Sequence, residues 1–482
     1  MPCTTILVGK KASYDGSTIV ARNEDSSNGE FCPKRFVARE APAAGTVYRS
    51  VLSHLEIELT EPGMRYTALP NADLKEGLWE EAGFNERNVG MSATETITTN
   101  ERVLAADPLV RYDAATGTPG GIGEEDMVTL VLPYMTSARD GVGRLGALLE
   151  RYGTYEMNGI AFSDANEIWW METVGGHHWI ARRVPDDCYV TMPNQLGIDD
   201  FDLDDAFGEQ VESMCSADLR EWMAENHLDL TIGLRGTHFN PRDAFGSHSD
   251  SDHVYNTPRA WAMQRALNPH AGPWDTAAPA ADFGPESDTI PWCREPERKL
   301  TIEDVKYVLS LHYQGTPYDP YAGGEKAGRY RPIGINRNSQ LAVLQLRPHV
   351  APERAALQWI AYGSNAFNAL VPLYANVCET PAYLEDTTTR VTSENFYWAN
   401  RLIGALADAA YGACLPHVER YQEALTARCA ALVRACDAEG GDLAACNAAI
   451  ADECRRQTED LLDRVLYETS MRMRNGFSRS DN

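Results

Sequence analysis

The residue with the clearest capacity for nucleophilic chemistry is Cys3, which opens the run Cys-Thr-Thr-Ile-Leu-Val at residues 3–8. β-Branched and apolar residues predict a strand here, and a strand at a chain end is normally tied into a sheet. If Met1 and Pro2 are removed, the thiol and a free α-amine share one Cα. An α-amine titrates near ~8, so it can act as the base for that thiol. On this stretch alone, an incidental cysteine near the start of the chain is the favoured interpretation, and the following residues change this.

A second predicted strand returns the chain to Cys3. The polar segment 10–17 contains an Asp-Gly turn signal, and the β-rich run at 18–22 follows it, which predicts a hairpin. This hairpin ends in Arg22-Asn23-Glu24-Asp25. An arginine near a thiol favours the thiolate, and a carboxylate near an α-amine can orient it and set its pKa. The competing interpretation of this cluster is a solvated strand end.

Together, Cys3, the hairpin and the Arg22-Asn23-Glu24-Asp25 segment resemble the opening of the dipeptidase A family of cysteine peptidases. That family is related to the bile salt hydrolases and penicillin V acylases, which are N-terminal-nucleophile (Ntn) hydrolases. The resemblance implies an α+β fold, a four-layer αββα sandwich with antiparallel sheets. It also implies Cys3 as the nucleophile, Arg22 and Asp25 beside it, and no metal or organic cofactor.

Three further site residues follow from the same resemblance. Asn194, after the predicted strand at 189–192, is expected to donate its amide N–H to the oxyanion, although a turn-forming asparagine would look the same. Arg259 matches the last catalytic arginine of the family and is expected to fix Asp25 or the thiolate; the alternative is a helix-start arginine after a proline. Glu95 replaces an asparagine of the bile salt hydrolases, and we expect it to meet the free amine of a peptide substrate.

The segment 238–253 is rich in histidine and aspartate and raises the possibility of a metal site. It lacks a His-Glu-x-x-His pattern, and its serines and glycine are typical of a loop. We therefore expect the segment to rim the active site rather than to bind a metal. The tyrosine-rich segment 318–331 is expected to form another loop near the site.

Helical patterns flank the predicted strands. Two helices are expected within 123–153, on an outer face of the sandwich, and another helix over 394–412. The segment 416–474 is predicted to form two long helices broken by Gly440-Gly441. We accordingly divide the chain into a catalytic domain, residues 3–399 with residues 1–2 removed, and a C-terminal helical extension, residues 400–475.

Four cysteines lie almost symmetrically about the Gly440-Gly441 turn. An antiparallel hairpin places Cys436 opposite Cys446 and Cys429 opposite Cys454. Because no secretion signal is present, we favour four free buried thiols. Two disulfides, or a four-thiolate metal site, are the alternatives.

Composition excludes several classes of partner. The chain has 482 residues, 43% hydrophobic, with 70 acidic residues against 43 basic ones and a net charge of −27. Such a surface repels nucleic acid and anionic membranes, and no apolar run is long enough to span a bilayer. Without a signal peptide, a cytoplasmic location is predicted. The family resemblance implies homo-oligomers.

The sequence therefore predicts a cytoplasmic Ntn dipeptidase of broad specificity that acts on small peptides through a thioester. One alternative is an acylase that cleaves a non-peptide amide at the same site. A metallopeptidase built on the 238–253 loop is a second alternative. The third is a non-catalytic protein that keeps the fold and uses its C-terminal hairpin as an interaction surface.

Overall fold

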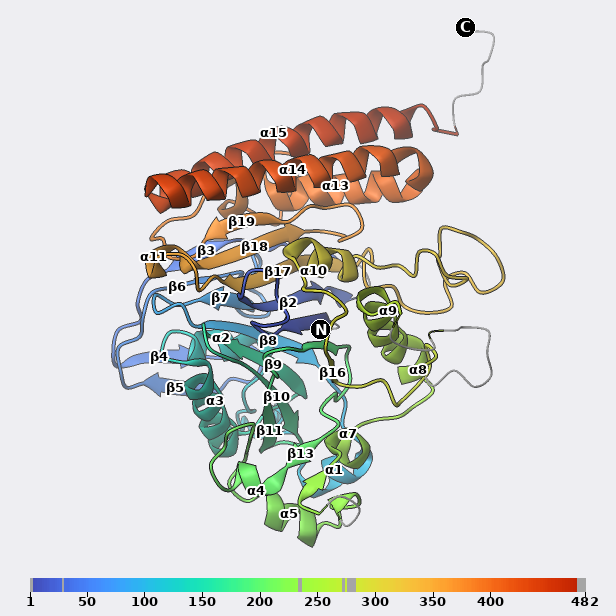
Figure 1. Ribbon diagram of the computed structural model, residues 1–482. Coiled ribbons are helices and arrows are strands. Elements are labelled where there is room, and N and C mark those ends of the chain that lie inside the picture. The colour runs from blue at the N-terminus through green and yellow to red at the C-terminus, as the bar shows by residue number, and fades with distance from the viewer. Residues whose placement is uncertain (1–2, 28–29, 233–235, 271–273, 275–282, 475–482) are drawn as a thin grey trace, which may run out of the picture.

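The computed structural model describes residues 3–27, 30–232, 236–270, 274 and 283–474. Met1 and Pro2, whose removal is predicted, lie outside these ranges. Two antiparallel sheets pack against each other in the middle of the molecule (Figure 1). The seven-stranded sheet contains, in spatial order, β16 (Cys293–Arg294), β12 (Tyr189–Met192), β1 (Cys3–Val8), β2 (Thr18–Asp25), β17 (Asn338–Leu346), β18 (Ala356–Tyr362) and β19 (Val371–Tyr374).

The second sheet has six strands and lies against β1 and β2. Its spatial order is β14 (Ser213–Cys215), β11 (His178–Arg183), β10 (Ile168–Val174), β9 (Asn158–Ser163), β8 (Gly90–Thr96) and β7 (Ala82–Phe84). Three two-stranded ribbons complete the β structure: β3 (Val37–Arg39) with β6 (Tyr66–Ala68), β4 (Thr46–Arg49) with β5 (Glu56–Leu59), and β13 (Phe201–Asp202) with β15 (His238–Phe239).

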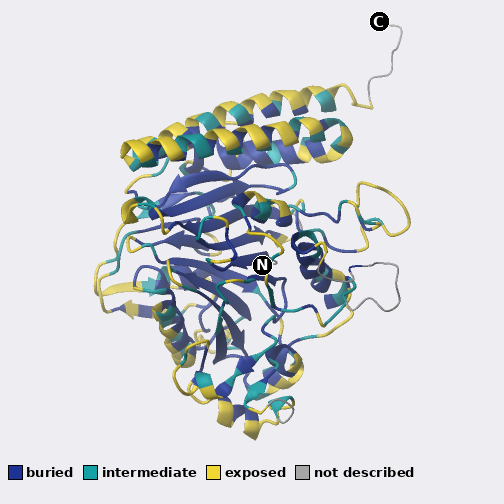
Figure 2. Cartoon of the chain, viewed as in Figure 1, coloured by how far each residue is buried: buried dark blue, intermediate teal, exposed yellow. Residues whose placement is uncertain are grey.

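Helices cover the outer faces of both sheets. Next to the six-stranded sheet lie α2 (Glu124–Val131) and α3 (Ala138–Tyr152), and over the seven-stranded sheet lie α13 (Phe396–Ala409), α14 (Tyr411–Glu439) and α15 (Leu443–Ser470) (Figure 1). Figure 2 shows the strands of the two sheets almost wholly buried and exposed residues on the outer helices, the loops and the short helices at the periphery. The predicted α+β class, with antiparallel sheets and a C-terminal helical hairpin, is confirmed.

The remaining helices are short or lie near the edge of the sheets. They are α1 (Glu101–Ala106), α4 (Leu203–Ala206), α5 (Leu219–Glu225), α7 (Pro241–Phe245), α8 (Asp252–Tyr255), α9 (Thr257–Leu267), α10 (Ile302–Val308), α11 (Pro352–Ala355) and α12 (Ala382–Glu385). Among the described residues, no helix is both long enough and apolar enough to cross a membrane.

The predicted N-terminal hairpin is present, but its second strand is longer than expected. β1 pairs with β2 in the register Cys3↔Glu24 and Thr5↔Arg22. β17 pairs with the other edge of β2 as far as Asp25, so all eight residues of β2 are buried. The interpretation of residues 22–25 as a solvated strand end is therefore wrong, because the strand lies in the centre of a sheet.

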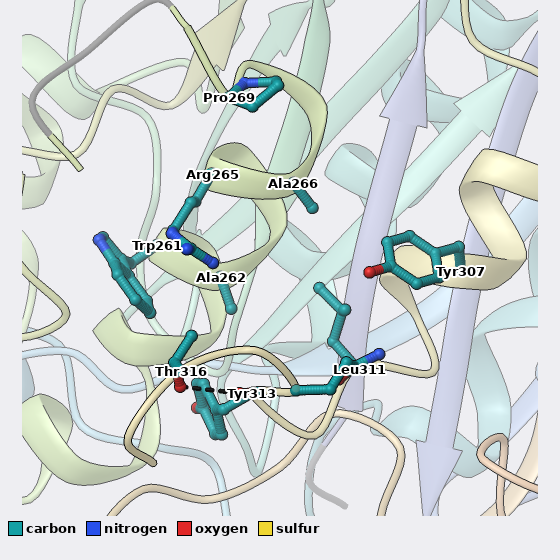
Figure 3. A pocket seen from close by; sticks show the side chains of 10 residues that line it. Trp261, Ala262, Arg265, Ala266, Pro269, Tyr307, Leu311, Tyr313 and Thr316 are labelled. Atoms are coloured by element: carbon teal, nitrogen blue, oxygen red, sulfur yellow. Dashed lines mark hydrogen bonds between the residues drawn. The ribbon is translucent and has the colours of Figure 1, made fainter. Parts of the chain in front are cut away.

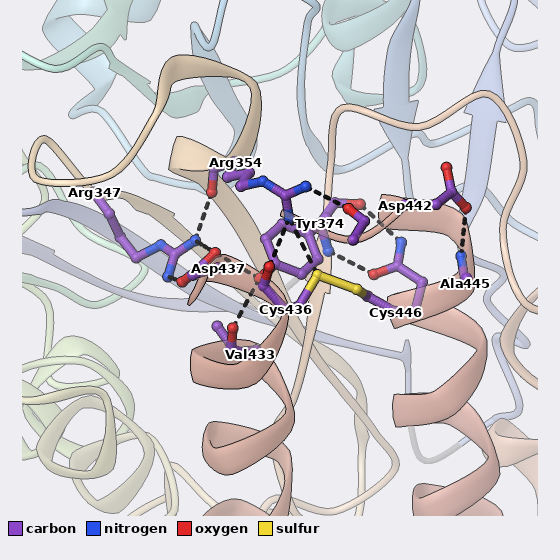
Figure 4. Close-up of a disulfide and its surroundings, with 11 residues drawn as sticks. Arg347, Arg354, Tyr374, Val433, Cys436, Asp437, Asp442, Ala445 and Cys446 are labelled. Carbon is purple, nitrogen blue, oxygen red and sulfur yellow. Dashed lines mark hydrogen bonds and ion pairs between the residues drawn. A yellow bond between two sulfur atoms is a disulfide. The ribbon is translucent and has the colours of Figure 1, made fainter. Parts of the chain in front are cut away.

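The C-terminal hairpin contains a disulfide that we did not favour. Cys436 and Cys446 are bonded across the turn, where their Cα atoms are 6.4 Å apart (Figure 4). Cys429 and Cys454 lie deeper in the hairpin and are free, buried thiols. Cys429, Cys436 and Cys454 are buried as predicted and Cys446 is partly buried, but the expectation of four free thiols is wrong for the pair nearest the turn.

Polar contacts attach this hairpin to the sheet edge. Asn447 accepts a hydrogen bond from the Tyr374 N–H (2.8 Å) and donates one to the Tyr374 carbonyl (3.0 Å), so its amide continues the ladder of β19. Arg347 forms an ion pair with Asp437 at 2.7 Å (Figure 4). An edge strand leaves backbone N–H and C=O groups unpaired, and the helices cover those of β19. The contacts with Asn447 supply hydrogen-bond partners for these buried groups.

Candidate active site

Cys3 is the first residue of β1 and is fully buried. Directly paired residues in an antiparallel ladder share a face, and side chains alternate along a strand. The register therefore puts Cys3, Thr5 and Arg22 on one face of the sheet. The Nη1 of Arg22 donates to the Cys3 sulfur at 3.2 Å. The predicted approach of arginine to the thiol is observed.

The opposite sheet and the segment before it hold Arg22 in place. The guanidinium donates to Ser92 Oγ (3.0 Å) and to the carbonyls of Ala93 (2.8 Å) and Thr94 (2.7 Å), and it forms an ion pair with Glu81 at 2.5 Å. Burial alone would lower the pKa of Arg22, but the negative charge of Glu81 raises it above its ordinary value. Arg22 is thus a fixed positive charge beside the sulfur.

A buried lysine continues this network away from the thiol. The Nζ of Lys34 lies 2.7 Å from Glu24 Oε2 and 3.3 Å from Glu81 Oε1, and all three side chains are fully buried. Glu81 therefore bridges Lys34 and Arg22. No sequence motif marks Lys34 or Glu81, and both were missed as members of the site.

Asp25 ends β2 and is held by two residues from the far part of the chain. It forms an ion pair with Arg331, and it accepts a hydrogen bond from Asn338 Nδ2 at 2.5 Å. Arg259, which we expected beside Asp25 or the thiolate, instead donates to the carbonyl of Cys3 and to Thr4 Oγ1 (2.6 Å). Arg259 therefore fixes the backbone of the nucleophile, and Arg331 fixes Asp25.

Asn194 lies directly against the backbone of Cys3. Its Oδ1 accepts from the Cys3 N–H at 3.3 Å and from Arg259 Nη2 at 2.7 Å, while its Nδ2 donates to the Thr96 carbonyl at 2.8 Å. Because an arginine can only donate, the orientation of the amide is fixed. One of the two N–H donors of Nδ2 is thus used by the Thr96 carbonyl.

A cavity of about 480 Å³ opens beside Asn194. Its walls include Asn256 and Tyr255, and also the serines and the aspartate of the 238–253 loop: Ser247, Ser249, Ser251 and Asp252. This loop was expected at the rim of the site, and that is where it lies. The cavity is large enough for a small organic ligand.

Two histidines of the 238–253 segment lie against aspartates. His238 lies 3.1 Å from Asp200, and His253 lies 3.0 Å from Asp288. A search of the described residues finds no group of three or more histidine, cysteine, aspartate or glutamate side chains that could hold a metal ion.

Glu95 is fully buried on β8, in the sheet that packs against the sheet of Cys3. Thr5 Oγ1 donates to its Oε2 at 2.8 Å, and its Oε1 has no hydrogen-bond partner in the described part of the chain. Burial raises the pKa of Glu95 to about 8, although the positive charge of Arg259 acts in the other direction. Glu95 can therefore change its charge near neutral pH.

The thiol of Cys3 is protonated in this environment. Burial raises its pKa well above the ordinary value; Arg22 lowers it, and Glu95 raises it further. A thiol with a raised pKa is a weak nucleophile and needs a base that removes its proton.

A second pocket, of about 250 Å³, lies apart from these residues. It is formed by α9 and the segment 307–316, with Trp261, Arg265 and Tyr313 among its walls (Figure 3). None of the predicted site residues lines it.

Comparison with known proteins shows the family of the chain. A family model described as peptidase family C69 matches residues 2–424, which include every site residue named above. The molecule is thus a peptidase of the cysteine type. The chain belongs to peptidase family C69, and the resemblance predicted from its sequence is confirmed.

Similar proteins cover the whole chain. It is 60% identical to a protein named dipeptidase from Bifidobacterium longum, over the full length of both chains. It is 53% identical to a probable dipeptidase A from Streptococcus pyogenes serotype M3, again over both full lengths. It is 41% identical to dipeptidase A from Lactobacillus helveticus, over 97% of this chain and 96% of that one.

Proposed function

We propose that this protein is a dipeptidase whose nucleophile is the thiol of Cys3 acting as the N-terminal residue, on a four-layer Ntn-hydrolase sandwich. The observation that carries the proposal is the position of Cys3 at the start of a central strand, with Arg22 against its sulfur and Asn194 against its nitrogen. Membership of family C69 and the names of the relatives support the choice of dipeptides as substrates.

The α-amine of Cys3 provides the base that the protonated thiol needs. Removal of Met1 and Pro2 frees this amine, which takes the thiol proton directly or through water. The thiolate attacks the scissile carbonyl carbon, and the carbonyl π electrons move to oxygen. In this step Asn194 Nδ2 exchanges its bond to Thr96 for one to the oxyanion, and a backbone N–H supplies a second donor.

The intermediate then collapses to a thioester. The C–N bond breaks, and the leaving nitrogen takes the proton from the Cys3 amine, so the second amino acid departs with a neutral amine. Water attacks the thioester and the same amine accepts one of its protons. The C–S bond then breaks, the amine returns that proton to the sulfur, and the first amino acid leaves as a carboxylate with its remaining proton released to solvent. Arg22 stabilises sulfur as thiolate, and Arg259 and Asp25 keep the strand end in place.

N-terminal sequencing of active enzyme, together with its intact mass, tests this mechanism directly. We expect the active protein to begin at Cys3 and to hydrolyse dipeptides. Cys3→Ala should abolish hydrolysis, whereas Cys378→Ser, which changes an exposed free thiol, should leave it intact. Fully active protein that retains Met1 and Pro2 would contradict the amine-base mechanism. A preference for N-acyl amides over dipeptides would identify an acylase instead.

A further inference from the structure

Arg331 is a buried cation whose hydrogen-bonding capacity is only partly used. Its side chain is 4% exposed and forms an ion pair with Asp25. Its Nε and Nη1 have no hydrogen-bond partner among the described residues. A buried charged group with open donors is costly in free energy, so such donors normally have a ligand or a partner.

A second guanidinium lies next to Arg331, on the ring of Tyr255. The Cζ of Arg331 is 4.8 Å from the centre of this ring and the Cζ of Arg337 is 5.9 Å from it, and Arg337 Nη2 donates to the Tyr255 hydroxyl at 2.6 Å. Burial, and next the positive charge of Arg337, lower the pKa of Arg331 to about 9. Within the described residues, Asp25 is the one carboxylate that forms an ion pair with either arginine, so the cluster carries surplus positive charge.

This arginine cluster lies beside the nucleophile and the cavity. Tyr255 lines the cavity next to Asn194. The carbonyl of Tyr255 accepts a hydrogen bond from Arg259 Nε at 2.8 Å, and Arg259 holds the Cys3 carbonyl. Arg331 is also close enough to Cys3 for its charge to interact with the thiolate. A ligand at Arg331 would therefore lie near a peptide bond under attack.

We propose that Arg331, assisted by Arg337, binds the free α-carboxylate of the dipeptide substrate. This inference rests on the proposed function. It assigns the part of the site that distinguishes a dipeptide from a longer peptide. In a dipeptide the carboxylate lies one residue beyond the scissile bond, whereas a longer peptide has a neutral amide there. A planar guanidinium pairs with a carboxylate through two parallel N–H donors, and a neutral amide would leave the cation buried and unneutralised.

Hydrolysis of alanyl-leucine and of its C-terminal amide tests the proposal. For the processed wild-type enzyme we expect kcat/KM to be at least about 100-fold higher for the acid than for the amide. Discrimination of this size is expected when the wrong substrate leaves buried polar groups of the site unpaired. Arg331→Met should reduce this ratio to within about threefold of unity, Arg331→Lys should restore part of it, and Arg337→Met should reduce it less.

The ratio separates carboxylate binding from a purely structural role of Arg331. If Arg331 served only to hold Asp25, Arg331→Met would slow both substrates equally and leave the ratio unchanged, which would overturn the proposal. Asn338→Ala provides the matched control, because it removes the other partner of Asp25 and should slow both substrates without changing the ratio. Near-equal rates for acid and amide in the wild type would overturn the carboxylate subsite while leaving the dipeptidase proposal intact. No hydrolysis of alanyl-leucine or other dipeptides would contradict the proposed function itself.

If Arg331→Met does not fold, the acid-to-amide ratios of the wild type and of Arg337→Met still test the carboxylate subsite. Arg337 is partly exposed, so its replacement should be tolerated by the fold. An unchanged ratio in Arg337→Met would limit the subsite to Arg331. A wild-type ratio near unity would rule it out.

Discussion

At the scale of single residues, the thiol of Cys3 is subject to opposing effects. Burial and the nearby Glu95 favour the protonated thiol, and Arg22 at 3.2 Å favours the thiolate. Burial prevails, so the arginine alone does not produce a permanent thiolate. In the proposed mechanism this is the physical reason for a base on the same residue: the amine takes the thiol proton, and Arg22 lowers the energy of the thiolate that forms.

Glu95→Gln tests the role of the buried carboxylate. The pKa of Glu95 is about 8 in the folded chain and about 4.5 when unperturbed, so between these values the folded state holds a proton that the unfolded state releases. Glu95 should therefore lower the free energy of unfolding of the wild type as pH rises from 5 to 8, by at most about 1.4 kcal/mol per pH unit. Glu124, Asp126 and Glu172, whose pKa values burial also raises to about 7, add to the total slope. Glu95→Gln should reduce the slope in thermal melts by the contribution of Glu95 and raise Tm at pH 8.

The same variant tests contact with substrate. If Glu95 receives the substrate amine, Glu95→Gln should raise KM for dipeptides about tenfold and leave KM for N-acetylated dipeptides unchanged. Thr5→Val is a matched control, because it removes the hydrogen bond to Glu95 but keeps the carboxylate. An unchanged KM for dipeptides in Glu95→Gln would remove the basis for this role.

The local sequence pattern found Arg22, and the family resemblance added Asn194, Arg259 and Glu95, but neither found Arg331 or Lys34. The hairpin brings Arg22 to the nucleophile, so their proximity follows from two short paired strands. Arg331 reaches Asp25 from a loop far along the chain, and Lys34 joins the site through Glu81. No short sequence pattern predicts either contact, because both depend on how the sheets pack against each other.

At the scale of elements, β2 explains why so many charges can be buried together. It is a central strand, paired with β1 on one edge and β17 on the other, so its polar side chains have no access to water. Arg22 and Glu24 each have an oppositely charged partner at 2.7 Å or less. Paired burial of this kind costs less than isolated burial, and it fixes side-chain positions close to the nucleophile.

The disulfide at the tip of the C-terminal hairpin should stabilise the protein. Cys436 and Cys446 close a loop of ten residues, which corresponds to roughly 2–3 kcal/mol through the lost entropy of the unfolded chain. The double variant Cys436→Ser, Cys446→Ser should lower the free energy of unfolding by about this amount, whereas Cys378→Ser should leave it nearly unchanged.

Thiol counting checks the bridge independently. Unfolded, unreduced protein should show nine titratable thiols, and reduction should raise the count to the eleven cysteines of the sequence. Eleven thiols before reduction would exclude the bridge. A double variant as stable as Cys378→Ser would show that the bridge contributes nothing to folding.

At the scale of the whole molecule, the C-terminal helices share the core of the sheets. Buried side chains of α14 and α15, including Val418, Leu425 and Ile450, belong to the same apolar cluster as Ile6 and Leu7 of β1. The 3.6-residue pattern predicted these helices and the turn between them. It could not predict their docking on β19, because the pairing of Asn447 with Tyr374 involves a single polar side chain within a helix.

A chain that ends at residue 410 tests whether the hairpin is a separate extension. This truncation removes α14 and α15, uncovers β19 and leaves Arg347 without Asp437. Because apolar burial contributes roughly 25 cal/mol per Å² and domains are only marginally stable, we expect the truncated chain to aggregate or to lose its cooperative thermal transition. Circular dichroism melts and the dipeptidase rate measure this outcome.

A loop-swapped chain in which only residues 440–442 are replaced by a longer Gly-Ser turn provides the matched control, since it keeps both helices and should fold. Independent folding and full activity of the truncated chain would support the division at residue 399. If the truncated chain does not fold and the control does, the hairpin is part of the catalytic unit. The helices that cover the seven-stranded sheet are then needed to hold β1, and with it Cys3, in the geometry that brings Arg22 to the sulfur.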